Sequence, residues 1–127
     1  MERVGAGSMG EVWKAHDERL DRDVAVKLLD LAAAPDPTIV ERFRREAIAT
    51  AQLNHTNIVS VFDAGTDGTH AYLVMTLLPG RTVADLVRAN GPMSLDQSLS
   101  LAIQVTSALR EAHRHGLVHR DIKPANV

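Results

Sequence analysis

The chain has 127 residues, of which 45% are hydrophobic, a length and composition that suit one modest globular domain and exclude a disordered chain as the default. Its net charge of -2 excludes a global basic field of the kind that binds nucleic acid or an anionic membrane surface, so any phosphate recognition must be local. It has no cysteine, which excludes disulfides, thiolate catalysis and cysteine-ligated zinc, and is compatible with a reducing cytosol. The longest apolar run, residues 71–78, is far too short for a bilayer span, so we expect no membrane contact by this segment.

Three glycines with the spacing G-x-G-x-x-G lie near the N-terminus: Gly5, Gly7 and Gly10. This spacing lets backbone amides approach a phosphate closely, because no Cβ intervenes. A Rossmann fingerprint is a rival interpretation, with Asp30 as its ribose-binding acid. It needs a helix from Gly10, but residues 11–23 show no apolar face at helical spacing and favour the second strand of a hairpin. A plain glycine-rich hairpin remains the alternative without a ligand.

Residues 23–30 alternate in a strand-like pattern that places Ala25, Lys27 and Leu29 on one face. A lysine that projects from a sheet beneath a glycine-rich loop is a natural phosphate ligand. A lysine on a strand is more commonly a solvated surface residue. The interpretation of Lys27 as a phosphate ligand therefore needs support from a partner residue.

A helix is predicted after the prolines at positions 35 and 37, with a capping box formed by Thr38 and Glu41. Its apolar stripe consists of Ile39, Phe43, Ala47 and Leu53. Helical projection places Glu46 inside this stripe, where an unpaired carboxylate costs several kcal/mol. Lys27 needs a partner for the same reason, so we predict that Lys27 and Glu46 pair.

Two further strands, residues 57–65 and 69–78, are predicted on either side of the turn-forming sequence at 64–68, which suggests a meander. A short helix over residues 82–90 ends at Gly91-Pro92. A capping box of Ser94 and Gln97 begins a longer helix that runs to about His115 and stops at Gly116. The order of strands, helix, strands and helices favours an α+β fold over a parallel wound sheet.

The segment His119–Asn126, with the sequence HRDIKPAN, follows that helix stop. A charge-rich surface loop is the alternative without function. However, Asp121 can accept a hydroxyl proton, Lys123 can neutralise a transferring phosphoryl group, and the Asn126 carbonyl can hold Mg²⁺. These three roles belong to one reaction.

With these motifs in place, the chain closely resembles eukaryotic-like serine/threonine protein kinases of the bacterial type. The resemblance covers essentially the whole chain, and the Asp-x-Lys-Pro order looks like the serine/threonine class and not the tyrosine class. Four ordered segments carry it, similar in turn to the glycine-rich loop, the third-strand lysine motif, helix C and the catalytic loop: residues 5–15, 24–27, 43–47 and 119–126.

The resemblance implies a protein-kinase-like fold, in which a five-stranded antiparallel sheet and helix C form an N-terminal lobe. That lobe and the hinge would occupy about residues 1–78, and the first helices of a helical C-terminal lobe about residues 79–127. ATP would lie between the lobes. Val12 and Ala25 would cover the adenine, Met75 would guard the back of the pocket, and Thr76 to Leu78 would be the hinge whose backbone bonds the adenine.

The resemblance also assigns the charged residues. Lys27 would hold the α- and β-phosphates and would be oriented by Glu46. Asp121 would orient the substrate hydroxyl and accept its proton, Lys123 would stabilise the transferred phosphoryl group, and Asn126 would bind a metal ion. The cofactors implied are ATP and Mg²⁺.

The resemblance has two gaps. The first strand has only four residues before Gly5, and the metal-binding Asp-Phe-Gly aspartate, the activation loop and most of the C-terminal lobe are absent. We therefore expect a fragment of a longer kinase that phosphorylates serine or threonine on proteins in signal transduction, inactive by itself. We expect a cytoplasmic location, with a downstream membrane anchor and a dimer of the longer protein left open. The alternative from another class is a non-catalytic, kinase-derived module that binds a nucleotide or a partner protein.

Overall fold

The structure, a computed structural model, describes residues 2–7, 10–32 and 37–127 of the chain. The chain divides into two compact units: Met1–Asn54 with Val59–Leu78, and His55–Ile58 with Pro79–Val127. The first contains the β-sheet and one helix, and the second is helical. This combination confirms the predicted α+β class.

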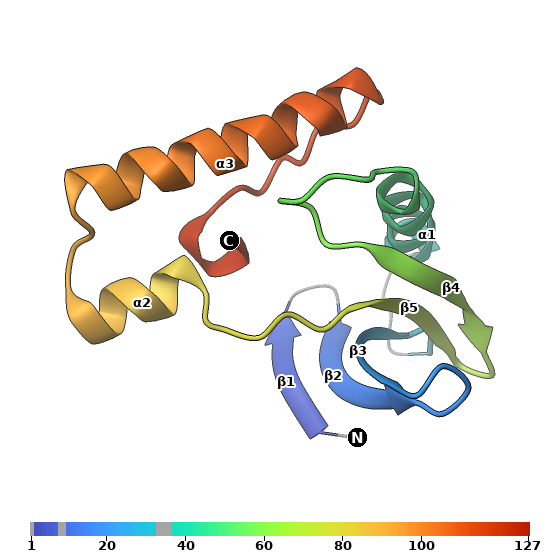
Figure 1. The fold of residues 1–127 in the computed structure, drawn as a ribbon. Coiled ribbons are helices and arrows are strands. Elements are labelled where there is room, and N and C mark those ends of the chain that lie inside the picture. The colour runs from blue at the N-terminus through green and yellow to red at the C-terminus, as the bar shows by residue number, and fades with distance from the viewer. Residues whose placement is uncertain (1, 8–9, 33–36) are drawn as a thin grey trace. The chain divides into compact units, whose positions relative to one another are not determined.

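The first unit is built on one sheet of five strands in the order β1-β2-β3-β5-β4 (Figure 1). Every neighbouring pair is antiparallel, which confirms the predicted five-stranded antiparallel sheet. Because β5 lies between β3 and β4, the chain leaves β3 through helix α1 and returns at the edge strand β4, so the five strands do not form a simple meander. The strands are β1 (Glu2–Gly7), β2 (Gly10–Asp17), β3 (Arg22–Asp30), β4 (Val61–Asp67) and β5 (His70–Thr76).

Helix α1 (Pro37–Ala51) supplies the other half of the core. Phe43 and Ala47, both from the predicted apolar stripe, are buried, and Ile39 packs beside them. The buried cluster joins them to residues that share one face of β3 and β5: Leu29, Ala71 and Leu73. Burial of this apolar face fixes α1 to the sheet.

The prediction for the ends of α1 was wrong. The helix begins at Pro37, so Thr38 lies inside it and does not precede it as a cap. Proline suits the first helical position because its fixed φ is already helical and its missing N–H would have no partner there. The helix ends at Ala51, which leaves Leu53 outside it.

The hairpin between β4 and β5 also differs from its prediction. Residues 64–67 belong to β4, which begins at Val61 and not at Asn57, and Asp67 pairs with His70. Only Gly68 and Thr69 form the turn, and Gly68 has φ 56°, the positive value that a type II′ turn requires at its first central residue. Four of the five residues in the predicted turn at 64–68 are therefore paired strand residues, although the segment is rich in turn-forming residues.

The second unit contains α2 (Val83–Asn90), α3 (Leu95–Arg114) and the short 3₁₀ helix η1 (Pro124–Asn126). The Thr82 side chain caps α2, and Ser94 with Gln97 forms the predicted capping box of α3. The last segment of the chain, red in Figure 1, returns to the start of α2, where Val83 N–H donates to the Val127 carbonyl at 2.8 Å. Among the described residues, no helix has the length and apolar character needed to cross a membrane.

Candidate active site

The glycine-rich hairpin joins β1 to β2, and Gly7 pairs with Gly10 across it. Gly10 has φ 110°, and a Cβ at this position would lie 2.0 Å from the Leu28 carbonyl oxygen. The fold itself therefore requires glycine at position 10, whatever the hairpin binds. At Gly5 a Cβ would meet only Val12 Cβ at an ordinary 3.9 Å. Residues 8–9, the tip of the predicted phosphate loop, lie outside the described residues.

One face of the sheet carries four of the predicted nucleotide-site residues. Val12 and Lys27 are opposite each other on β2 and β3, and Ala25 is opposite Met75 on β3 and β5. Since alternate residues of a strand share a face, all four lie on the same side. This side also carries the buried core residues under α1, and Ala25 is itself buried.

Lys27 lies near α1. Its Nζ atom is 5.7 Å from the centroid of the Phe43 ring, within reach of a cation–π contact. The sequence placed Phe43 in the core but did not indicate this contact. Glu46 belongs to the same helix, but its side chain lies outside the described part of the chain. The pairing of Lys27 with Glu46 therefore stays a prediction.

The end of β5 is fixed to the residue that precedes β4. Thr76 N–H donates to the Ser60 carbonyl at 3.0 Å, and the Thr76 hydroxyl reaches the same oxygen at 3.4 Å. Leu78, two residues further on, is 62% exposed. The predicted hinge thus starts from a hydrogen-bonded residue and continues into an exposed one.

The catalytic-loop candidates converge on one atom of the second unit, Asp121 Oδ2. Lys123 Nζ lies 2.9 Å from it, and Asn126 Nδ2 donates to it at 3.0 Å. Asn126 Nδ2 also donates to the Asp121 backbone carbonyl at 2.9 Å. The structure therefore brings together the three residues that the sequence proposed for phosphoryl transfer.

The charge state of Asp121 follows from these contacts. The hydrogen bond from Lys123 is the main cause that holds the pKa of Asp121 below its ordinary value, and Asn126 acts in the same direction. Asp121 N–H donates to His119 Nδ1 at 3.2 Å, and Arg120 between them has a left-handed φ of 64°. The carboxylate is thus ionised near neutral pH and held by a tightly turned backbone.

Oxygen atoms of this loop suit a hard cation. Because the Asn126 amide nitrogen donates to Asp121, its amide oxygen is the atom left to act as a metal ligand. The described residues contain no group of three or more His, Asp or Glu side chains that could hold a metal. One or two oxygen ligands fit Mg²⁺ that arrives with phosphates and retains water, and do not form a complete protein cage.

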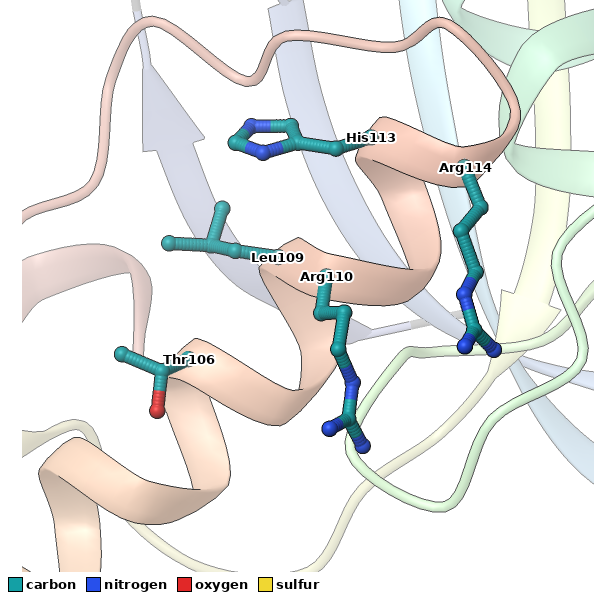
Figure 2. Close-up of a pocket in the computed structure, with 5 residues that line it drawn as sticks. All are labelled: Thr106, Leu109, Arg110, His113 and Arg114. Carbon is teal, nitrogen blue, oxygen red and sulfur yellow. The ribbon is translucent and has the colours of Figure 1, made fainter.

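Two surface hollows lie elsewhere. One is lined by residues of α3 alone, and Figure 2 shows Arg110 and Arg114 projecting from one side of the helix while Leu109 and His113 project from another. The other lies between α1 and β4, where Ile48 and Phe62 line it. None of the predicted site residues lines either hollow.

Comparison with known proteins gives consistent matches. Residues 1–127 match the family described as protein kinase domain. The chain is 45% identical to the serine/threonine-protein kinase PknB of Mycobacterium leprae and 42% identical to PrkC of Bacillus subtilis, over 98% of its length in each case. It covers only 21% and 19% of those two proteins. A crystal structure of the Mycobacterium tuberculosis PknI kinase domain matches 99% of the chain with a TM-score of 0.86 and 31% identity, and the match covers 52% of the PknI chain.

Proposed function

Because the chain belongs to the protein kinase family, we propose that the protein built on it transfers the γ-phosphoryl group of ATP to serine or threonine hydroxyls of proteins. Curated relatives with 42% to 45% identity are named serine/threonine-protein kinases, which supports this hydroxyl specificity. The chain spans about a fifth of the length of these relatives, so activity and substrates are proposed for the longer protein.

The observation that carries the proposal is the convergence of Lys123 and Asn126 on Asp121 Oδ2. Asp121 orients the acceptor hydroxyl and takes its proton as the new O–P bond forms and the bond from the γ-phosphorus to ADP breaks. Its lowered pKa makes it a weak base, so orientation is its larger contribution. Lys123 can turn from the carboxylate towards the phosphoryl oxygens and offset their charge.

The sheet face of the first unit is the proposed nucleotide surface. Val12 and Ala25 contact the adenine, Met75 limits the depth of its pocket, and Thr76 and Leu78 bond it through their backbone. The half-buried environment beside the core supports this arrangement, because the flat faces of adenine pack on apolar side chains while its polar edge takes the backbone hydrogen bonds. Gly5, Gly7 and Gly10 let backbone amides approach the phosphates.

Lys27, oriented by Glu46, holds the α- and β-phosphates in this proposal. Bound Mg²⁺ would neutralise phosphate charge, and the Asn126 amide oxygen is the ligand that this chain offers it. A second metal ligand, the Asp-Phe-Gly aspartate, does not occur in residues 1–127. We therefore expect the 127-residue chain to bind ATP–Mg²⁺ weakly and to transfer no phosphate.

The proposed reaction bears on the cellular location of the protein. We infer a cytoplasmic location for the domain, because the proposed reaction uses ATP and protein hydroxyls, and a chain without cysteine is compatible with a reducing compartment. Immunodetection in separated cell fractions tests this location. Dimer formation by the longer protein stays a prediction.

The direct test uses a protein in which residues 1–127 continue through the rest of a kinase domain. Lys27→Met should abolish phosphate transfer from labelled ATP to a serine-containing protein, and Glu46→Gln should lower the rate at limiting ATP. Lys14→Met is the matched control, because Lys14 lies on the neighbouring strand and pairs with Asp23 at the exposed surface. Equal losses in Lys14→Met and Lys27→Met would contradict the assigned role of Lys27.

A non-catalytic, kinase-derived binding module is the second candidate. It predicts nucleotide binding that depends on Lys27 but no phosphate transfer by the extended protein. Isothermal titration with ATP–Mg²⁺, alongside the transfer assay, separates the two functions.

A further inference from the structure

A four-residue segment, His55–Ile58, belongs to the second unit although the residues before and after it belong to the first. It lies in the connection between α1 and β4, far from α3 in sequence. Two side-chain contacts attach it to α3: His55 Nε2 lies 3.0 Å from Ser107 Oγ, and Asn57 Nδ2 donates to Gln104 Oε1 at 3.0 Å. The connection is therefore held to α3 at its middle.

The protonation state of His55 follows from its other ring nitrogen. The backbone N–H of Asn57 donates to His55 Nδ1 at 3.0 Å, so Nδ1 carries no proton. A neutral imidazole then has its proton on Nε2, which donates to Ser107 Oγ. Both bonds form together only in this tautomer. A proton added at Nδ1 would face the Asn57 N–H and break that bond.

His115 provides the opposite case in the same unit. Its Nδ1 lies 3.0 Å from the Glu111 backbone carbonyl, an acceptor, so this nitrogen donates and protonation of the ring keeps the bond. The Glu111 carboxylate also lies 3.5 Å from His115 Nδ1. Acid pH should therefore preserve the His115 contact while it breaks the His55 contact.

Few charges surround the His55 contact. Residues 54–60 contain no Asp, Glu, Lys or Arg, and the charged or titratable residues of α3 that follow Ser107 within two turns are Arg110, Glu111, His113 and Arg114. Glu111 lies one turn from Ser107 but is engaged by Arg114 at 3.8 Å and His115 at 3.5 Å. Figure 2 shows the Arg110 and Arg114 side chains projecting from the same side of α3. The one carboxylate in this group, Glu111, already lies beside Arg114 and His115. It is therefore not an unpaired anion that would hold a charged His55 in place.

We propose that neutral His55 is a pH-sensitive latch that holds residues 55–58 on α3, and that protonation of its ring releases the segment. The latch comprises the bond from Asn57 N–H to His55 Nδ1 and the bond from His55 Nε2 to Ser107. Release follows from the geometry, because a protonated Nδ1 is a donor and can no longer accept the Asn57 N–H. The proposal does not depend on the kinase reaction.

NMR spectroscopy of the ¹⁵N-labelled 127-residue chain tests the proposal. Ring ¹⁵N shifts at pH 7.5 should show His55 with its proton on Nε2. The hydrogen-exchange protection factor of the Asn57 amide should fall about fivefold to tenfold between pH 7.5 and pH 5, the loss of roughly one hydrogen bond. The amide of Thr106, inside α3, should keep its protection factor and serves as an internal reference for the helix.

Two variants make the test specific. In His55→Phe the Asn57 amide should show the lower protection at both pH values, whereas His115→Gln should leave its pH dependence unchanged. If His55→Phe does not fold, Ser107→Ala should weaken protection at pH 7.5 while leaving the Nδ1 acceptor in place. A proton on Nδ1 of His55 at pH 7.5, or an Asn57 protection factor that does not change with pH, would overturn the proposal.

Discussion

Asn126 Nδ2 bridges two oxygens of Asp121, the backbone carbonyl at 2.9 Å and the carboxylate Oδ2 at 3.0 Å. The two bonds close a ring from Asp121 to Asn126, which is the last residue of η1. They also fix the direction of the Asn126 amide, since the nitrogen is committed to Asp121. The metal-ligand role proposed for the Asn126 oxygen depends on this geometry.

Replacement of Asn126 should therefore change the metal requirement of the extended kinase. We expect Asn126→Ala to raise the Mg²⁺ concentration needed for half-maximal activity by about tenfold or more, because an oxygen ligand is lost. A titration of activity against free Mg²⁺ measures this shift. Asn90→Ala, at the exposed end of α2, should leave the titration unchanged. A lower maximal rate with an unaltered Mg²⁺ titration would assign Asn126 only a structural role.

The pKa of Asp121 gives a prediction about pH. Its folded pKa is lowered, so the stabilisation of the loop is fully present above the ordinary aspartate pKa and is lost as pH falls through the lower, folded value. Lys123→Ala should raise the titration midpoint of the Asp121 carboxyl carbon more than Asn126→Ala does, because the Lys123 bond is the main cause of the shift. Carbon-13 NMR between pH 2 and 6 measures both midpoints. The reverse order would show that the ion pair is weaker than the amide bond.

Gly10 and Gly5 should respond differently to the same substitution. Gly10→Ala places a Cβ against the Leu28 carbonyl at a positive φ, so it should destabilise the chain by at least about 2 kcal/mol. Gly5→Ala meets no such obstacle and should change the free energy of unfolding by less than about 1 kcal/mol. Urea unfolding of both variants provides the comparison. Equal stability would mean that the hairpin does not hold Gly10 against β3.

Two phenylalanines test the position of the core. Phe43, on the core-facing side of α1, is 4% exposed, and Phe43→Ala should cost about 3–5 kcal/mol. Phe62 is 41% exposed and stacks under the Arg22 guanidinium at 3.7 Å, so Phe62→Ala should cost only about 1 kcal/mol. Thermal and urea unfolding measure both. A larger loss of stability in Phe62→Ala than in Phe43→Ala would contradict the assignment of Phe43 to the core.

Local signals in the sequence were sufficient for some parts of the fold. The capping box of Ser94 and Gln97 acts within one helical turn, and it was predicted correctly. The turn before β5 was misplaced because residues 64–68 all tolerate turns, and only pairing with β5 determines that Gly68 and Thr69 form it. Pairing between distant strands overrides the turn preference of individual residues.

The same division applies to the candidate site. The order of residue types in the loop indicated Asp121, Lys123 and Asn126, but not that two of them would share one oxygen of the third. The bond from Val83 to Val127 joins residues 44 positions apart, and the His55–Ser107 contact spans 52. Contacts of this kind depend on the folded backbone and have no local sequence pattern.

Steady-state kinetics of Asp121→Asn in the extended kinase would show whether Asp121 acts on the acceptor hydroxyl. The side chain keeps its size but loses its charge and its capacity to accept a proton. We predict that kcat falls by about 10²–10⁴-fold while the Kd for ATP–Mg²⁺ changes less than threefold, because Asp121 addresses the hydroxyl and not the nucleotide. A kcat equal to that of the unsubstituted protein, or a loss that appears entirely as weaker ATP binding, would contradict this role of Asp121.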